Sequence, residues 1–462
     1  MASGENAYDV VILGTGLTGS LLGATLAGNG LRVLLTDTDT HPKCEPGEVL
    51  PYDVVTILRR LADRYRIPAI RTLTRYDNCR EIAGPVFGVN RYTVMTAHHR
   101  EGTTTTIARP AAKSPSLSHL YRPASDGYLF YQAVLQGCDA RQGWTISGIK
   151  LDDEEIVVTG ADSASVRGRY LVDTTPAPRS PLVSELGLRL APLPGRCRRL
   201  YWTHLAGVAA RESGEGLTCH VFDDAWLWLA PFNNDHQSRN PLCAVGVIAD
   251  DPAGDGAEAC FATIIGRLPE LAGQLAGAVP LREWQTVSPV SYAVGQLHGS
   301  RWCLAGPAAG AVDPLFGGNF RLAARAVEAL VPCLLEESTG GGSVGGEVVD
   351  ARFTAIGKLQ HDLIELENRS VTVAHGAVHD QARWELVVRA WLARVTAAAD
   401  PGGAGTDGVG TLRVEEGCRR LLEVAENDGS DRLQAALTAT CHQVGLRELA
   451  DTAQHDFRIR HA

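Results

Sequence analysis

Hydrophobic and polar residues follow two different periods along this chain, and the changes of period predict its elements. An apolar strand from Tyr8 to Leu13 ends at Gly14, and an apolar helical run and a second strand, Arg32 to Asp37, follow it. A helix between two buried strands predicts the start of a doubly wound α/β domain. Helical spacing returns from Asp53 to Tyr65, after a loop rich in proline and glycine.

Polar and apolar residues alternate over 70–112, where we expect strands that shape a pocket. A helix opens near Arg122, with Ser125 or Asp126 as its predicted N-cap. Three strands with polar turns are expected after it, at 144–151, 155–159 and 165–172.

Strand patterns dominate from 182 to 295, where aromatic residues are frequent. Trp226 and Trp228 lie two residues apart in one strand and therefore share one of its faces. Such a pair either packs a core or faces a ligand. A later strand ends in a glycine-rich turn at 306–319, and helical spacing continues from there to about Glu337.

Helical patterns prevail after a glycine-rich linker at 340–346. The last fifty residues read as two or three short helices, which we expect to dock on the strand-rich lobe. The fold class is α/β: a doubly wound dinucleotide-binding domain with an inserted β-rich domain and a C-terminal helical region. The predicted boundaries are 1–181 for the first part of the nucleotide module, 182–295 for the β-rich substrate domain, 296–340 for the second part of the module and 347–462 for the helical region.

The turn after the first strand has the spacing of a pyrophosphate site. Gly14 makes the turn, Gly16 lets backbone amides approach the anion, and Gly19 packs the helix closely. Asp37 ends the second strand, where an acid bonds the ribose hydroxyls. The predicted cofactor contacts in this unit are Gly14, Gly16, Leu17, Thr18, Gly19 and Asp37.

Composition narrows the possible partners. The chain has 462 residues, 45% hydrophobic and 21% charged, and a formal charge of -10, which argues against nucleic-acid binding. The sequence shows neither a signal peptide nor an apolar run long enough for a membrane span, so we expect a cytoplasmic protein. The 11 cysteines are scattered without a CxxC pair and predict neither disulfides nor a zinc site.

Two histidine pairs resemble metal-ligand spacings. His98 and His99 are adjacent on a predicted strand and point to opposite faces. His375 and His379 share a helix face and precede Asp380, but no third ligand follows. We therefore predict no metal site.

Three motifs together resemble the flavin-dependent halogenases and related flavoprotein monooxygenases. The first is the glycine turn and acid followed by Pro46-Gly47-Glu48, which is similar to the family's Gly-Glu-Ser loop beside the flavin. The second is the Trp226–Pro231 strand, which resembles the family's Trp-x-Trp-x-Ile-Pro signature. The third is the 306–316 turn, which resembles its second flavin motif. The resemblance implies a para-hydroxybenzoate-hydroxylase-like architecture that binds FAD.

This resemblance also implies site residues. Gly47, Glu48 and Arg122 would flank the cofactor, and the second turn would add Gly306, Asp313, Gly317, Gly318 and Asn319. Glu48 and His119 are candidates for proton handling, although a polar structural role is open for each. Trp226 and Trp228 would separate flavin from substrate.

Several residues depart from the family's pattern. No lysine lies between Lys43 and Lys113, and Asn90 takes the place nearest to the family's lysine that captures hypohalous acid. Val49 replaces the serine of the flavin loop, and Pro176 and Pro178 replace a flexible turn. Pro307 stands where the family has an aspartate for the ribityl chain.

Three functions remain open at this point. The first is an FAD-dependent monooxygenase acting on an aromatic or polyketide-type substrate, free or held on a carrier or partner protein. The second is a halogenase with a displaced lysine. The third is a protein that binds FAD weakly or has lost it, and serves as a cofactor-independent cyclase or a binding partner. A separate flavin reductase is a further expected partner, since the sequence contains no distinct nicotinamide site.

Overall fold

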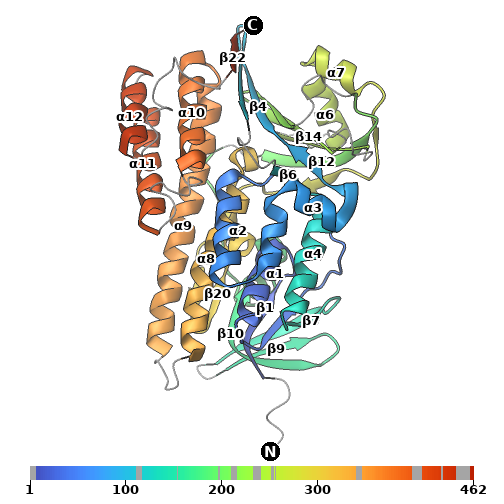
Figure 1. Ribbon diagram of the computed structural model, residues 1–462, viewed down its shortest axis with the longest axis vertical. Coiled ribbons are helices and arrows are strands. Elements are labelled where there is room, and N and C mark those ends of the chain that lie inside the picture. The colour runs from blue at the N-terminus through green and yellow to red at the C-terminus, as the bar shows by residue number, and fades with distance from the viewer. Residues whose placement is uncertain are drawn as a thin grey trace, which may run out of the picture.

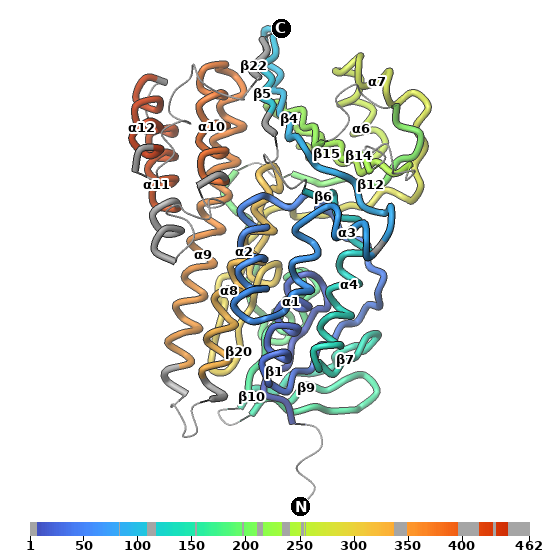
Figure 2. The backbone as a smooth tube through the Cα atoms, viewed as in Figure 1, coloured from blue at the N-terminus to red at the C-terminus, as the bar shows by residue number. Residues whose placement is uncertain are grey.

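The computed structural model describes residues 7–110, 117–152, 155–195, 198–209, 216–232, 241–250, 254, 256–339, 346–397, 408–427, 430–443 and 458–461. A nucleotide-type α/β module forms the lower half of the view in Figure 1, a strand-rich lobe lies at the upper right, and long helices line the left side. The tube in Figure 2 shows the same three parts, with the two chain ends at opposite poles.

The α/β module is built on a parallel sheet. β1 (Ala7–Leu13) pairs in parallel with β2 (Val33–Thr36) and β10 (Ser165–Asp173), and β10 pairs in parallel with β20 (Trp302–Leu304). The sheet order is β19-β20-β10-β1-β2-β7, with β8 (Ile146–Leu151) and β9 (Ile156–Gly160) attached to β10. The remaining edges are β7 (Asp139–Arg141) and β19 (His298–Gly299). Both halves of the nucleotide module, distant in sequence, therefore share one sheet, as predicted.

Helices cover this sheet because its strands are apolar on both faces. One core joins buried residues of α1 (Leu17–Ala27), α2 (Tyr52–Arg64), α4 (Arg122–Leu135) and α8 (Gly318–Thr339) with residues of β1, β2 and β10. The order strand, helix, strand puts the N-terminus of α1 at the carboxyl edge of β1, where ligands of this fold class bind.

The lobe is a mostly antiparallel sheet extended by strands from the first part of the chain, which join it through the parallel pair β13 and β4. Its order is β16-β12-β15-β14-β13-β4-β5-β22, with β17 paired to β12. These strands are β4 (Tyr92–His98), β5 (Thr104–Pro110), β12 (Arg198–Ala206), β13 (Gly216–Val221), β14 (Ala225–Pro231), β15 (Leu242–Asp250), β16 (Val279–Pro280), β17 (Gln285–Val287) and β22 (Arg458–His461). Strands from 70–112 thus belong to the same sheet as the 182–295 lobe.

Part of the 70–112 segment is helical, which differs from the prediction. η1 (Pro68–Thr74) and α3 (Tyr76–Ala83) precede η2 (Gly84–Val86) and β3 (Gly88–Asn90), which pairs with β6 (Leu117–His119). The predicted cap of α4 is also wrong, because the helix starts at Arg122 and Tyr121 is its N-cap. Pro123 favours the first helical turn, so the chain enters the helix earlier than Ser125.

The C-terminal helices pack in two layers. Buried residues of α9 (Gly346–Ala377) and α10 (Gln381–Ala397) share one core with the lobe face that carries Trp202 and Trp226. α11 (Gly408–Asn427) and α12 (Ser430–Gln443) pack on α9 and α10 and form the outer layer at the left of Figure 1. The prediction for the last fifty residues is only partly right: α11 and α12 are helices, but the segment that joins the lobe sheet is the strand β22, next to β5, and 444–457 lie outside the described residues.

Short elements complete the described chain: η3 (Ala177–Arg179), α5 (Pro181–Glu185), β11 (Leu190–Pro192), α6 (Ala257–Ile265), α7 (Pro269–Leu275), β18 (Tyr292–Val294), η4 (Gly306–Ala308), β21 (Gly310–Ala311) and η5 (Pro314–Phe316). Among the helices described, none combines the length and the apolar character that crossing a bilayer requires.

Candidate functional site

The first glycine turn contains two glycines that packing requires and one that faces open space. Gly14 has φ +95°, and a Cβ there would lie 2.7 Å from Thr174 Oγ1. A Cβ on Gly19 would lie 1.8 Å from the Gly14 carbonyl oxygen. A Cβ on Gly16 would meet no atom of the described residues within 4 Å. Gly16 is also the N-cap of α1, which has no side-chain cap, so its position fits a ligand that approaches the helix N-terminus.

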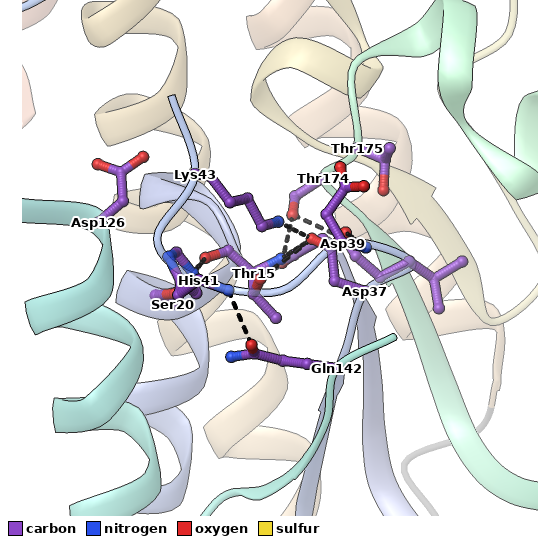
Figure 3. A network of polar contacts seen from close by, with 12 residues as sticks. Thr15, Ser20, Asp37, Asp39, His41, Lys43, Asp126, Gln142, Thr174 and Thr175 are labelled. Carbon is purple, nitrogen blue, oxygen red and sulfur yellow. Dashed lines mark hydrogen bonds and ion pairs between the residues drawn. The ribbon is translucent and has the colours of Figure 1, made fainter. Parts of the chain in front are cut away.

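Asp37 and Lys43 close this turn from the side of β2. The Asp37 carboxylate accepts hydrogen bonds from the Thr15 amide at 2.6 Å and from Lys43 Nζ. The Nε2 atom of His41 lies 2.9 Å from the carbonyl oxygen of Thr15 (Figure 3). Burial of Asp37 opposes ionisation, but the Lys43 ammonium outweighs it and keeps the pKa of this carboxyl below its ordinary value. Lys43 was not predicted, because a single lysine in a loop carries no motif.

The two glycine turns meet in space. Gly306 has φ +57°, and a Cβ there would lie 2.9 Å from Thr18 Oγ1 of the first turn. The Gly306 amide donates to Gln360 Oε1 at 3.0 Å, and Gln360 in turn donates to the Leu304 carbonyl at 2.9 Å. α9 thus fixes the second turn against the end of β20.

The rest of the second turn is bound mainly to protein groups. Asn319 spans the turn by accepting from the Val312 amide at 2.9 Å and donating to the Val312 carbonyl at 2.8 Å. A Cβ on Gly317, whose φ is +70°, would overlap Pro51, and one on Gly318 would crowd Val312. These three predicted cofactor residues bring the turn close to the loop that carries Glu48, and their contact with a flavin remains a prediction.

Asp313 connects this turn to the tryptophan strand. Its carboxylate accepts from Trp226 Nε1 at 3.0 Å and from the Leu315 amide at 3.0 Å, and Arg198 lies 3.4 Å away. His375 of α9 completes the group, 3.9 Å from the carboxylate. Asp313 therefore orients Trp226 and joins three parts of the fold.

Arg122 holds the flavin-side loop. It forms a two-pronged ion pair with Asp126 and donates to the Pro46 carbonyl at 2.8 Å and the Gly47 carbonyl at 3.0 Å. Its guanidinium also lies 5.4 Å from the centre of the Phe320 ring. Arg122 therefore sets the position of Gly47, as a residue beside the predicted cofactor site.

Trp226 and Trp228 share one face of β14, as predicted, and their ring centres lie 5.2 Å apart. Gly246 on β15 lies opposite Trp228, and a Cβ there would overlap the indole. Trp226 is buried in the core shared with α9 and α10, whereas Trp228 is only partly buried against it. The pair therefore packs at this core, and the role of the two indoles beside a ligand stays a prediction.

Glu48 makes a short polar contact with a distant strand of the lobe. It is 5% exposed, and its Oε1 lies 2.5 Å from Nε2 of His204, a residue of β12 that is fully buried. The Glu48 carbonyl accepts from the Leu120 amide at 2.6 Å, which fixes the loop against β6. His204 was not predicted, because its partner is 156 residues away in sequence.

His119 lies beside this contact on β6. Its Nδ1 is 2.9 Å from the Pro231 carbonyl, and its Nε2 has no hydrogen-bond partner among the described residues. Asn90 lies on the same face of the two-stranded sheet and is 2% exposed, with its Oδ1 unpartnered there as well. Burial lowers the pKa of His119 to about 4, so this imidazole is neutral at pH 7.

His119→Asn is expected to reduce the loss of stability in acid. The His119 pKa of about 4 is below its unfolded value, so its contribution is present above pH 6.5 and lost as the pH falls toward 4. The difference between the folded and unfolded pKa values of His119 corresponds to about 3 kcal/mol of folding stability. The asparagine amide keeps a donor for Pro231. Urea unfolding at pH 7 and pH 4.5 measures the effect, with the surface variant His379→Asn as control; equal acid losses in all three proteins would contradict this assignment.

Among the described residues, the members of each histidine pair contact different groups. His98 Nε2 lies 3.0 Å from His220 Nδ1, whereas His99 contacts the Val378 carbonyl and Thr105. His375 contacts the Phe222 carbonyl, and His379 lies 3.7 Å from Asp223. Within the described residues, no three histidine, cysteine or acidic side chains are placed to share a metal ion.

Comparison with known proteins was made by sequence and by structure. No family model matches the sequence. The chain is 32% identical over 417 residues to the tetracycline 7-halogenase of Kitasatospora aureofaciens, an alignment that covers 84% of this chain and 73% of the relative. It is 30% identical over 412 residues to the monodechloroaminopyrrolnitrin halogenase PrnC of Pseudomonas fluorescens, with 84% and 71% covered.

Solved structures share the fold. Halogenase PltM in complex with phloroglucinol and FAD superposes with a TM-score of 0.84 at 23% identity, over 96% of this chain and 99% of that one. CmlS, a flavin-dependent halogenase, gives 0.64 at 18% identity, over 95% and 78%. The fold and its two joined glycine turns define a flavoprotein of the FAD-binding class. The chain belongs to the flavin-dependent halogenase family, whose cofactor is FAD.

Proposed function

We propose that the chain binds FAD and uses its reduced form with oxygen and a halide to halogenate an aromatic or polyketide-type substrate. The 32% identity to a tetracycline halogenase, over 84% of this chain, carries this proposal. It differs from the first expectation, a monooxygenase, because two relatives of this similarity are both halogenases.

The residues present fit the adenosine half of FAD. Gly16 leaves open space at the uncapped N-terminus of α1, where a pyrophosphate would accept backbone hydrogen bonds. Asp37 is held ionised at the end of β2, ready for ribose hydroxyls. The flavin half would lie toward Gly47 and the 317–319 turn, with Pro307 offering no amide to it. When bound and reduced, FAD supplies the electrons that activate oxygen.

The protein groups perform the other parts of the reaction. Arg122 holds the Gly47 loop and Asp313 orients Trp226, and the aromatic lobe would exclude water from the substrate. A separate flavin reductase would supply the reduced cofactor. The substrate would be a small molecule, free or tethered to a carrier protein.

Hydroxylation by the same cofactor is the second candidate. The observation that favours it is the absence of lysine from 44–112, together with the buried amide Asn90 in that segment. An amide has no ammonium proton with which to polarise hypohalous acid. The third candidate, a fold without redox chemistry, is motivated by Val49, Pro176 and Pro307, which stand at positions that face the flavin in the family.

Product mass separates the candidates. The protein is incubated with FAD, a flavin reductase, NADH and phloroglucinol as the first probe, with chloride, with bromide and without halide. Products that carry the isotope pattern of the added halide are expected. A product with one added oxygen, formed equally without halide, would support hydroxylation instead. FAD binding without any oxidised product on a panel of phenols would contradict both.

A further inference from the structure

His204 lies on the sheet face that borders the tryptophan strand. Ala244 of β15 lies between His204 of β12 and Ala230 of β14. Two residues along β15, Gly246 lies between Trp202 of β12 and Trp228 of β14. Side chains of aligned residues point to the same face of a sheet. Small residues therefore flank a histidine and two tryptophans on the face that meets the Glu48 loop.

The contact with Glu48 fixes the orientation of the His204 ring. Both side chains are nearly inaccessible, at 0% and 3% exposure, and Nε2 lies 2.5 Å from the carboxylate. A neutral imidazole in this position donates from Nε2, which leaves Nδ1 as an acceptor. Nδ1 is buried and has no hydrogen-bond partner among the described residues. An unmet buried acceptor of this kind is costly unless a ligand supplies a donor.

A series of contacts leads from the surface to this ring. Arg282 lines an open hollow of about 800 Å³ together with Leu281 and Trp284. Its guanidinium donates to Tyr121 OH at 3.1 Å and to Cys44 Sγ. The Tyr121 ring lies 5.6 Å from the His204 ring, edge to face. Arg282 and Tyr121 thus lie between the hollow and His204.

We propose that Glu48 and His204 form a proton-transfer pair for a substrate with an acidic hydroxyl, a phenol or an enol. The substrate hydroxyl donates to His204 Nδ1, and Glu48 stabilises the imidazolium through Nε2, as the carboxylate does in other carboxylate–histidine pairs. This proposal rests on the proposed function and names its substrate class.

The step moves one proton and no electron pair between molecules. The substrate O–H bond breaks, the Nδ1–H bond forms, and the substrate keeps the electron pair as a phenolate or enolate. That anion has a more nucleophilic ring carbon than the neutral hydroxyl compound, which suits attack on an electrophilic halogen. The imidazolium returns its proton to the product oxygen.

Other charged and titratable groups face the pair. On the flavin side, the Glu48 charge contributes to the raised pKa values of Cys44 and Arg122. Burial raises the thiol pKa of Cys243 on β15, and the Glu48 charge adds to this effect. Arg282 and Tyr121 complete this shell on the hollow side. Burial, the largest effect, raises the pKa of Cys44 to about 11, so neither cysteine competes as a base at pH 7.

Two variants separate proton transfer from a merely structural role. In His204→Gln the amide nitrogen replaces Nε2 and keeps a donor for Glu48, but no group remains that accepts a proton. Glu48→Gln keeps the contact and removes the charge. The matched control is His361→Gln: His361 lies on α9, and its Nε2 is 3.0 Å from the Val294 carbonyl of β18.

The first readout needs neither FAD nor turnover. The protein is labelled with nitrogen-15 in its histidines, and the NMR signals of His204 are identified as those that disappear in His204→Gln. These signals should show Nε2 protonated and Nδ1 unprotonated at pH 7. Phloroglucinol added to this protein should show phenolate absorbance at a lower pH than in buffer, and this shift should disappear in His204→Gln. A protonated Nδ1 at pH 7 would overturn the proposal, whatever the outcome of FAD titration.

The second readout is turnover of phloroglucinol. We expect His204→Gln to retain its melting temperature and FAD affinity, to lower kcat by roughly 100-fold at pH 7, and to recover as the pH rises and the phenol ionises unaided. Unchanged kcat and an unchanged pH profile would overturn the proposal. If His204→Gln does not fold, Glu48→Gln is measured at saturating FAD for the same loss of kcat and the same pH profile. Failure of FAD to bind wild-type protein would sink the proposed function but leave the first readout standing.

Discussion

Gly16→Val is expected to weaken FAD binding by roughly 100-fold or more while leaving the fold intact. The open space next to Gly16 accommodates a side chain in the protein alone, and its φ of −71° suits any residue. The same side chain would occupy the path by which a pyrophosphate reaches the amides of α1. Loss of one or two hydrogen bonds to a charged group costs about 3 kcal/mol, which corresponds to a factor of about 100. Quenching of flavin fluorescence on titration measures the effect.

Gly19→Ala is the matched comparison. Its Cβ would lie 1.8 Å from the Gly14 carbonyl, so this variant should lose folding stability itself. The contrast between the two glycines distinguishes a ligand cradle from a packing contact. If Gly16→Val bound FAD like the wild type, the first turn would not be the pyrophosphate site.

Arg321→Met is expected to lower the free energy of unfolding by about 3–5 kcal/mol, because it leaves the buried Asp53 carboxylate without its ion-pair partner and removes one of the two arginines that bind Glu367. Arg321 of α8 is 3% exposed and bonds Asp53 of α2 and Glu367 of α9, with 2.8 Å to Glu367. Arg394 of α10 binds the other oxygen of Glu367 at 2.5 Å. Burial opposes ionisation of Asp53, but Arg321 outweighs it and lowers the pKa of that carboxyl. Urea unfolding at pH 7 measures the loss.

Arg369→Met is the control for this experiment. Arg369 forms a two-pronged pair with Glu426 of similar geometry, but its side chain is 27% exposed. Solvent screens such a pair, and its loss should cost less than about 1 kcal/mol. Similar losses of unfolding free energy in both variants would show that the contribution of the Asp53–Arg321–Glu367–Arg394 network to stability does not depend on its burial.

Local patterns in the sequence were sufficient for the parts of the site that depend on neighbouring residues. Gly14, Gly16 and Gly19 could be assigned because the order of strand, turn and helix restricts each position. The shared face of Trp226 and Trp228 follows from the period of a strand alone. The joining of both flavin motifs in one sheet followed from the resemblance and not from any period.

Contacts between distant segments could not be read from the sequence. His204 reaches Glu48 only because β12 lies in a sheet next to β15, and that register is set by packing across the whole lobe. Asp313 was predicted as a cofactor contact from its motif, yet its oxygens meet Trp226 and the Leu315 amide. Polar alternation over 70–112 suggested strands, but the start of that segment is helical, with buried Ile70 and Leu73 facing the α/β core.

The measurement that tests the central claim most directly is an equilibrium titration of the purified protein with FAD and, in parallel, with FMN. Two glycine turns that meet at Gly306 and Thr18 predict one FAD per chain, with much weaker binding of FMN, which lacks the adenosine half. Equal affinity for FAD and FMN, or no binding of FAD at saturating concentration, would contradict it.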